Sequence, residues 1–186
     1  MKLIILDRDG VINYDSDEFI KSPDEWRPIP GSLETIARLT KAGYILAIAS
    51  NQSGVGRGYF SLETLNAINK KMLNAIEKQG GYISALVFCP HLPDDNCDCR
   101  KPKPGLLHQI GQKLKVSLDQ ALVIGDSLRD IQAGLAVNAK AALVLSGKGA
   151  KTFAQHAEVL KDIPVYKDLA DFVNHLEAVA NSQDGA

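Results

Sequence analysis

Short apolar runs alternate with longer amphipathic stretches from one end of the chain to the other. The runs at residues 2–6, 44–49 and 83–88 are rich in aliphatic side chains without polar alternation, which is typical of strands buried on both faces. Stretches with apolar residues at helical spacing separate these runs. The alternation predicts an α/β fold, in which crossover helices join the strands of a mainly parallel sheet.

The same patterns give the order of elements along the chain. We predict strands at residues 2–6, 44–49, 83–88, 121–124, 141–145 and 164–166, and helices at residues 31–42, 61–78, 104–115, 127–137, 150–157 and 169–179. No repeat or low-complexity tract interrupts the chain, and 186 residues suit one domain. We therefore predict a single domain over residues 1–180, followed by a flexible tail over residues 181–186.

Composition limits the class of partner. The 21 basic residues nearly balance the 22 acidic ones, and no apolar run reaches the roughly 18 residues that a membrane span needs. We therefore expect a small-molecule ligand, with no nucleic-acid or membrane partner. The three cysteines cannot all pair, and the start of the chain does not resemble an export signal. We expect a cytoplasmic protein, which we predict to be a monomer.

Two carboxylates follow the first predicted strand, in the sequence Asp7-Arg8-Asp9-Gly10. In open parallel sheets, ligands bind at the carboxyl ends of the strands, where the topology changes direction. One carboxylate there can attack phosphorus while a second transfers protons, and a divalent cation relieves their mutual repulsion. Taken alone, the tetrapeptide is equally typical of an Asp-Gly turn with solvated acids.

Polar residues also follow the second and fourth predicted strands. The run from Ser50 to Gly58 allows backbone N–H groups to approach an anion closely, although such runs are more often only flexible turns. After the fourth strand, Asp126 lies at the strand end and Asp130 one helical turn later on the same face. Asp126 can join the first two carboxylates at the sheet edge, or it can simply cap the following helix.

Four potential metal ligands are crowded into residues 89–99, namely Cys89, His91, Cys97 and Cys99. Three thiolates and one imidazole complete a tetrahedral Zn²⁺ site with no open position, which is typical of a structural zinc. The alternative is a set of reduced surface thiols beside a loop histidine. The cations Arg100 and Lys101 follow the last ligand directly, so a zinc-bound loop would hold them at an anion.

These motifs, in this order at successive strand ends, resemble those of the haloacid dehalogenase (HAD) superfamily. The resemblance covers residues 2–145 and implies a three-layer Rossmann-like fold and a magnesium-dependent phosphotransferase. It implies Asp7 as the nucleophile and Asp9 as the acid and base. It further implies phosphate binding by Ser50, Asn51 and Lys101, Mg²⁺ binding by Asp7, Asp126 and Asp9, the last through its backbone carbonyl, and a supporting role for Asp130, which would orient Lys101 or the metal shell.

The segments between the predicted strands leave little room for a cap domain, so we predict an essentially capless enzyme with an open cleft. Two loop cations, Arg57 and Arg100, are expected to bind a second anionic or polyhydroxyl part of the substrate. Asp15 and Asp17, in the loop after the first strand, are expected to be solvated.

The zinc pattern followed by Arg100-Lys101-Pro102, together with residues 26–31 and 50–58, closely resembles the D-glycero-D-manno-heptose 1,7-bisphosphate 7-phosphatase family. This resemblance implies a sugar phosphate substrate and removal of its C7 phosphate through an aspartyl-phosphate intermediate. It also implies a step in the synthesis of ADP-heptose or GDP-heptose, which supplies heptose for lipopolysaccharide.

Three alternatives remain. Histidinol-phosphate phosphatases share the zinc loop and the aspartate motifs. A non-catalytic zinc-stabilised binding module is disfavoured by the complete set of catalytic residues. A relative of polynucleotide 3′-phosphatases is disfavoured by the near-neutral charge.

Overall fold

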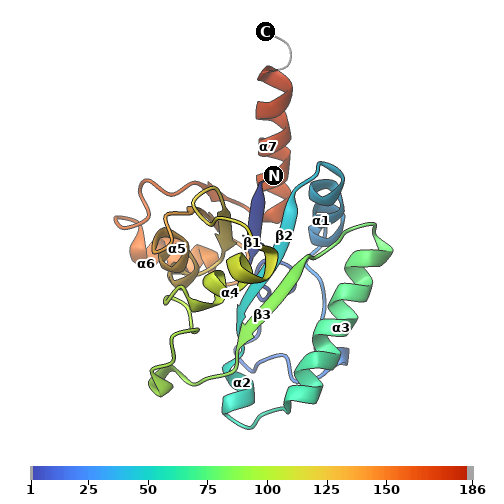
Figure 1. Cartoon of the computed structure of the whole chain (residues 1–186), viewed down its shortest axis with the longest axis vertical. Coiled ribbons are helices and arrows are strands. Elements are labelled where there is room, and N and C mark those ends of the chain that lie inside the picture. Colours follow the sequence, from blue (N-terminus) through green and yellow to red (C-terminus); the bar gives the residue numbers. More distant parts are fainter. Residues whose placement is uncertain (1, 184–186) are drawn as a thin grey trace.

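Six strands form one sheet at the centre of the computed structural model, which describes residues 2–183 (Figure 1). They are β1 (Leu3–Leu6), β2 (Ile45–Asn51), β3 (Ala85–Cys89), β4 (Leu122–Gly125), β5 (Lys140–Val144) and β6 (Val165–Tyr166). Their order across the sheet is β3-β2-β1-β4-β5-β6, and every neighbouring pair is parallel. The predicted parallel α/β sheet is confirmed.

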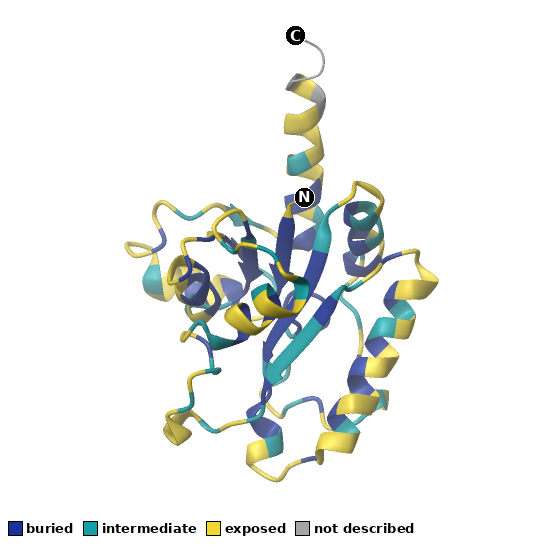
Figure 2. Ribbon diagram, in the orientation of Figure 1, coloured by how far each residue is buried: buried dark blue, intermediate teal, exposed yellow. Residues whose placement is uncertain are grey.

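Helices cover both faces of this sheet. They are α1 (Ser32–Lys41), α2 (Ser53–Gly56), α3 (Leu62–Lys78), α4 (Gly105–Leu114), α5 (Leu128–Leu135), α6 (Gly149–His156) and α7 (Leu169–Gln183), with 3-10 turns at Pro23–Glu25 and Pro93–Asp95. One face is covered by α1, α3 and α7, and the other by α4 and α5. Figure 2 shows the buried strands between helices whose outer faces are exposed. The three-layer architecture is therefore confirmed.

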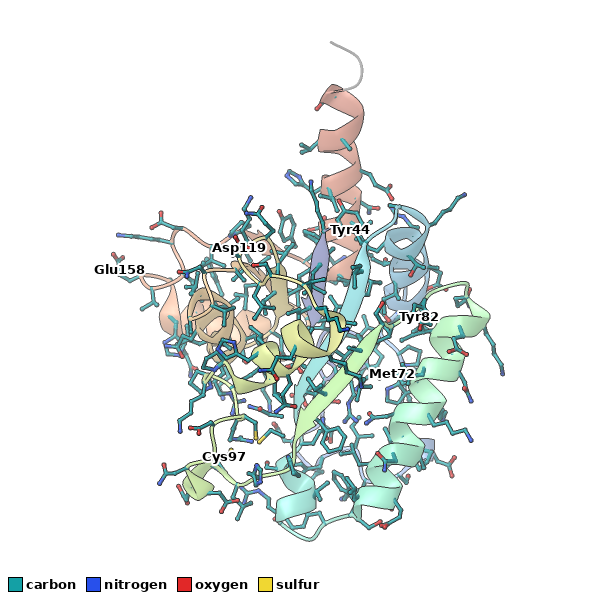
Figure 3. The ribbon with its side chains drawn as sticks, in the orientation of Figure 1. Tyr44, Met72, Tyr82, Cys97, Asp119 and Glu158 are labelled. Atoms are coloured by element: carbon teal, nitrogen blue, oxygen red, sulfur yellow. The ribbon has the colours of Figure 1, made fainter. Side chains whose placement is uncertain are left out.

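The apolar spacing in the sequence accounts for the face that each helix buries. In α1, Leu33, Ile36 and Leu39 recur on one side and join the core against β1 and β2. Met72 of α3, labelled in Figure 3, lies in the same core and is fully buried. The helix begins after Ser61, whose side-chain oxygen accepts a hydrogen bond from the backbone N–H of Thr64.

Within the glycine-rich run the structure contains a single-turn helix, α2, which is not among the helices predicted from the sequence. A Cβ atom at Gly56 would lie 2.6 Å from the carbonyl oxygen of Pro90, and one at Gly54 would overlap the ring of Phe60. Close packing therefore requires glycine at both positions, independently of any role of this run in binding an anion.

The last helix, α7, projects beyond the rest of the fold, as Figure 1 shows. It runs to Gln183 and so includes the first three residues of the segment expected to be a flexible tail. Residues 184–186 lie outside the described residues. Among residues 2–183, no helix has both the length and the apolar character that a bilayer span requires.

The strand order changes direction at β1. The chain runs from β1 to β2 and β3 on one side, and then crosses to β4, which pairs with the other side of β1. Such a switch point leaves a crevice at the carboxyl ends of the two central strands. In the described part of the chain, short loops and single helices connect the strands without an inserted domain, which confirms the essentially capless architecture.

Candidate active site

Three carboxylates from two strand ends meet in the crevice. Asp7 follows β1, Asp126 follows β4, and Asp130 lies in the first turn of α5. One oxygen of each lies within 4.8 Å of the others. This proximity follows from the pairing of β1 with β4, because the backbone N–H of Asp7 donates to the carbonyl of Ile124 at 3.0 Å. Such a cluster offers oxygen ligands for a divalent cation.

Burial and mutual repulsion make the carboxyl groups of Asp7 and Asp126 hard to ionise without a cation. Burial raises the pKa of Asp7 to about 7, although the nearby ammonium group of Lys101 opposes the shift. Burial and the charge of Asp7 raise the pKa of Asp126 to about 8. A divalent cation placed between them would supply the missing positive charge, so the donor set fits Mg²⁺.

The backbone is shaped around the carboxylate of Asp126. Gly10 and Gly147 both have positive φ, of +82° and +57°, and a Cβ atom at either position would overlap the Oδ2 of Asp126. The backbone N–H of Lys148 donates to the same oxygen at 2.7 Å. Two glycines and one amide thus fix this side chain at the strand end.

The ammonium group of Lys101 lies beside two of these carboxylates. Its ammonium group lies 3.1 Å from Asp7 Oδ1 and 2.6 Å from Asp130 Oδ1, and donates to the carbonyl of Ala49 at 2.6 Å. Burial lowers the pKa of such an ammonium group, but Asp130 and Asp7 outweigh that effect and raise it. The group is therefore a charged donor beside the candidate nucleophile, and its contact with Asp130 is the one expected if Asp130 orients Lys101.

Asn51 holds the backbone of Lys101 in place. Its amide Nδ2 donates to the carbonyl oxygen of Lys101, and its Oδ1 accepts from the backbone N–H of Lys101, both at 3.1 Å. The end of β2 is thereby joined to a residue 50 positions later. The side chain of Asn51 supports the lysine and also lines the cavity.

Asp9 lies apart from the metal-binding cluster. Its carboxylate accepts hydrogen bonds from Arg8, Asn13 and Gln52, and it lines the cavity. No hydrogen bond from the described residues reaches its backbone carbonyl, the atom that the sequence analysis assigned to Mg²⁺. Asp9 can therefore offer a carbonyl to a cation and a separate carboxylate to a proton.

A cavity of about 220 Å³ opens above these groups. Charged and polar side chains from several loops surround it. Besides the four aspartates, Asn51 and Lys101, the lining residues include Asp15, Gln52, Ser53, Arg100, Ser127, Arg129 and Lys148. Arg129 also borders two neighbouring surface hollows. Burial and the cation of Arg129 lower the pKa of Arg100, so two cations face one region at the cavity rim.

Two expected phosphate or substrate ligands are placed differently from the prediction. The hydroxyl of Ser50 is buried, accepts a hydrogen bond from Gln52 at 2.8 Å, and is not among the cavity-lining groups. Arg57 is exposed at the end of α2 and also lies outside the cavity lining. Arg129 occupies the rim instead, which the sequence analysis missed because an arginine on a helix surface carries no distinctive pattern.

Asp15 corrects another expectation, because it is not simply solvated. Its carboxylate lies 3.0 Å from the ammonium group of Lys148, and its side chain is 19% exposed. Asp17 lies 3.4 Å from the same ammonium group and remains largely exposed. The loop after β1 is thereby tied to the loop after β5 across the cavity mouth.

The Cys and His side chains converge in the loop after β3, near Cys97 in Figure 3. The four ligand atoms are separated by 3.5 Å between Cys89 and His91, 3.6 Å between Cys89 and Cys97, 3.5 Å between Cys97 and Cys99, and 3.2 Å between His91 and Cys99. Tetrahedral Zn²⁺ with ordinary bond lengths needs separations of about 3.6–3.8 Å. The observed separations equal the lower end of this range or lie up to about 0.4 Å below it, so the four donors are gathered closely enough for one ion and the donor set fits zinc.

The fold and the site together define a hydrolase of the HAD class. Residues 98–172 match the HAD-hydrolase-like family. The structure superimposes with a TM-score of 0.91 on D,D-heptose 1,7-bisphosphate phosphatase from Bordetella bronchiseptica, solved with magnesium and phosphate; the two chains are 49% identical, with 96% of this chain and 99% of that one covered.

Similar proteins narrow this class of hydrolases to one family. The D-glycero-beta-D-manno-heptose-1,7-bisphosphate 7-phosphatase of Neisseria meningitidis serogroup A is 50% identical over 95% of both chains. The enzyme of the same name from Pseudomonas putida is 48% identical over 95% of this chain and 99% of its own. The chain belongs to the D-glycero-beta-D-manno-heptose-1,7-bisphosphate 7-phosphatase family.

The raised pKa values of Asp7 and Asp126 predict a pH-dependent affinity for Mg²⁺. At pH 6 both groups hold protons that a cation must displace, whereas at pH 8 Asp7 is mostly ionised and Asp126 is about half ionised. We expect the dissociation constant for Mg²⁺ to fall at least about tenfold from pH 6 to pH 8, measured by titration calorimetry. An Asp126→Asn variant should bind Mg²⁺ weakly throughout; an affinity of the intact chain that stays flat over this range would contradict the prediction.

Proposed function

We propose that this chain removes the C7 phosphate of D-glycero-D-manno-heptose 1,7-bisphosphate, in the synthesis of ADP-heptose or GDP-heptose. The observation that carries the proposal is the contact between Lys101 and Asp7, beside Asp126, in an open crevice. The chain that holds this site is about 50% identical to enzymes of that name. The substrate is a small sugar phosphate. We further propose that the enzyme acts in the cytoplasm as a monomer.

Asp7 is the proposed nucleophile. Both of its described contacts fall on Oδ1, which accepts from the backbone N–H of Arg8 at 2.7 Å and lies beside Lys101. Its Oδ2 is therefore available to attack the C7 phosphorus as the bond from phosphorus to the C7 oxygen breaks. Bound Mg²⁺ would supply positive charge to the phosphate oxygens, and Asp7, Asp126 and the backbone carbonyl of Asp9 would hold it.

Asp9 is the proposed proton carrier. In the first half of the reaction its carboxyl proton passes to the departing C7 oxygen, which leaves as an alcohol. In the second half its carboxylate takes a proton from water, and the water oxygen attacks phosphorus and releases inorganic phosphate from Asp7. Throughout, the ammonium group of Lys101 stabilises the charge on the phosphate oxygens.

We propose that the Cys and His cluster holds a structural Zn²⁺. All four positions of a tetrahedron would be filled by protein, which leaves none for substrate. Arg100 follows the last ligand, and its guanidinium donates to the carbonyl of His91 at 3.3 Å within the loop. The zinc loop thus supports both Arg100 at the cavity rim and the neighbouring Lys101 at the nucleophile.

Phosphate release from purified protein tests the proposed substrate. We expect rapid Mg²⁺-dependent release from heptose 1,7-bisphosphate and much slower release from histidinol phosphate, with the α and β anomers assayed separately. Asp7→Asn should reduce turnover to background in a folded protein, because an amide is a poor nucleophile. Preference for histidinol phosphate would replace the proposed substrate, and a fully active Asp7→Asn enzyme would exclude the aspartyl-phosphate mechanism.

Removal of one zinc ligand tests the metal loop. We expect one zinc per chain by elemental analysis after dialysis, and loss of that zinc in His91→Ala, with a lower melting temperature and reduced turnover. His108→Ala is the matched control, because this exposed histidine on α4 lies outside the cluster and should leave all three measurements unchanged. Full zinc content and activity in His91→Ala would show that the cluster is not a zinc site.

The position of Arg100 at the cavity rim predicts that this arginine, and not Arg57, selects the bisphosphate. Arg100→Lys removes a planar fork of donors, so kcat/KM for the bisphosphate should fall about 10- to 100-fold, with little change for a simple aryl phosphate. Arg57→Lys serves as the control and should leave both values nearly unchanged, because Arg57 lies outside the cavity lining. A selective loss in Arg57→Lys, with none in Arg100→Lys, would reverse this assignment.

A further inference from the structure

We propose that Arg8 is a positioning residue for Asp9, and that Asn69 of α3 holds Arg8 in place. This inference rests on the proposed function only in taking Asp9 as the proton carrier. Arg8 lies between the two acidic residues of the first motif, where an arginine would ordinarily extend into solvent. Instead it is among the most buried large side chains of the described residues, with 1% of its surface exposed.

The guanidinium of Arg8 is divided between two partners. Its Nε donates to Asp9 Oδ1 at 3.1 Å and its Nη2 donates to Asp9 Oδ2 at 3.0 Å, so that the fork contacts both carboxylate oxygens. Its Nη1 donates to Asn69 Oδ1 at 3.1 Å. A buried cation is stable only with such partners, and a lysine could not reproduce the planar fork.

Two further donors complete the surroundings of the Asp9 carboxylate. Asn13 Nδ2 donates to Oδ1 at 2.8 Å, and Gln52 Nε2 donates to Oδ2 at 2.7 Å. Four protein hydrogen bonds, two from Arg8 and one each from Asn13 and Gln52, thus fall on the two carboxylate oxygens. The side chain still lines the cavity, with 21% of its surface exposed. Its orientation toward the substrate is therefore fixed by the protein and not by solvent.

Asn69 makes this arrangement depend on helix α3. The residue is 6% exposed and lies 61 positions after Arg8 in the chain. Without the side-chain carbonyl oxygen of Asn69, the buried Nη1 of Arg8 would lack an acceptor, and the guanidinium would shift to find another one. Movement of the guanidinium would release the carboxylate of Asp9. Asn69 thus acts on the reaction through Arg8 and does not itself contact substrate.

The leaving group distinguishes positioning of Asp9 from a general structural role. When an alkyl phosphate is cleaved, the departing oxygen is strongly basic and needs the proton of Asp9 as its bond to phosphorus breaks. When p-nitrophenyl phosphate is cleaved, nitrophenolate departs without that proton. Misplacement of Asp9 should therefore slow the first half of the alkyl reaction far more than the first half of the aryl reaction, whereas the second half, in which Asp9 takes a proton from water, is common to both substrates.

The experiment measures the first half of the reaction by itself, with enzyme in excess in a single turnover, as release of the alcohol from a sugar phosphate and of nitrophenolate from p-nitrophenyl phosphate in Asn69→Leu and in Arg8→Lys. We expect the rate of alcohol release from the sugar phosphate to fall about 10- to 100-fold and the rate of nitrophenolate release to fall less than about threefold, the same pattern as in Asp9→Asn. Asn69→Asp keeps an acceptor for Arg8 and should restore the sugar phosphate reaction. Asn66→Leu, an exposed asparagine on the same helix, is the matched control and should change neither rate.

Equal losses on both substrates, or no loss on either, would overturn the proposal. Thermal melting shows whether each variant is folded, and if Arg8→Lys fails to fold, the comparison of Asn69→Leu with Asn69→Asp decides. The ratio of the two rates can be measured with any sugar phosphate that the enzyme hydrolyses. A failure of this inference is therefore distinct from an error in the heptose assignment, which the substrate comparison above tests.

Discussion

The ammonium group of Lys101 joins parts of the chain that would otherwise repel or separate. It lies between Asp7 at the end of β1 and Asp130 in α5, and it also donates to the carbonyl of Ala49 in β2. These carboxylates crowd together because parallel strands deliver their carboxyl ends to one edge of the sheet. A buried cluster of like charges is unfavourable without a cation, so the site depends on the positive charge of Lys101.

The loop after β3 exists in its observed form because it must deliver that cation. A buried ammonium group is stable only when it is paired and hydrogen-bonded, so the backbone of Lys101 must be placed where its side chain meets Asp7 and Asp130. Asn51 fixes its peptide group, and the Cys and His cluster folds the preceding residues into a compact loop. Four side chains gathered in this way keep the loop short and leave the cavity mouth open.

Positive charge at this site is divided among distinct tasks. Lys101 lies beside the nucleophile, Arg8 is buried behind Asp9, and Arg100 and Arg129 face the cavity rim. Lys148 joins the loops across the mouth through Asp15. Because there is no cap domain in the described chain, these cations and the loops that carry them are the part of the structure that can discriminate among phosphate esters.

The sequence by itself determined the layered parallel sheet, the strand ends that carry Asp7 and Asp126, and the four-residue Cys and His cluster. Each follows from a local pattern, such as the period of apolar residues or the spacing of ligands, which the chain displays without folding. Only the tertiary structure decided that Arg8 points inward, that Ser50 contacts Gln52, and that Arg129 lines the cavity in place of Arg57. The direction of a side chain depends on partners distant in the sequence, as Asn69 is from Arg8, and no local period records which of those partners will meet.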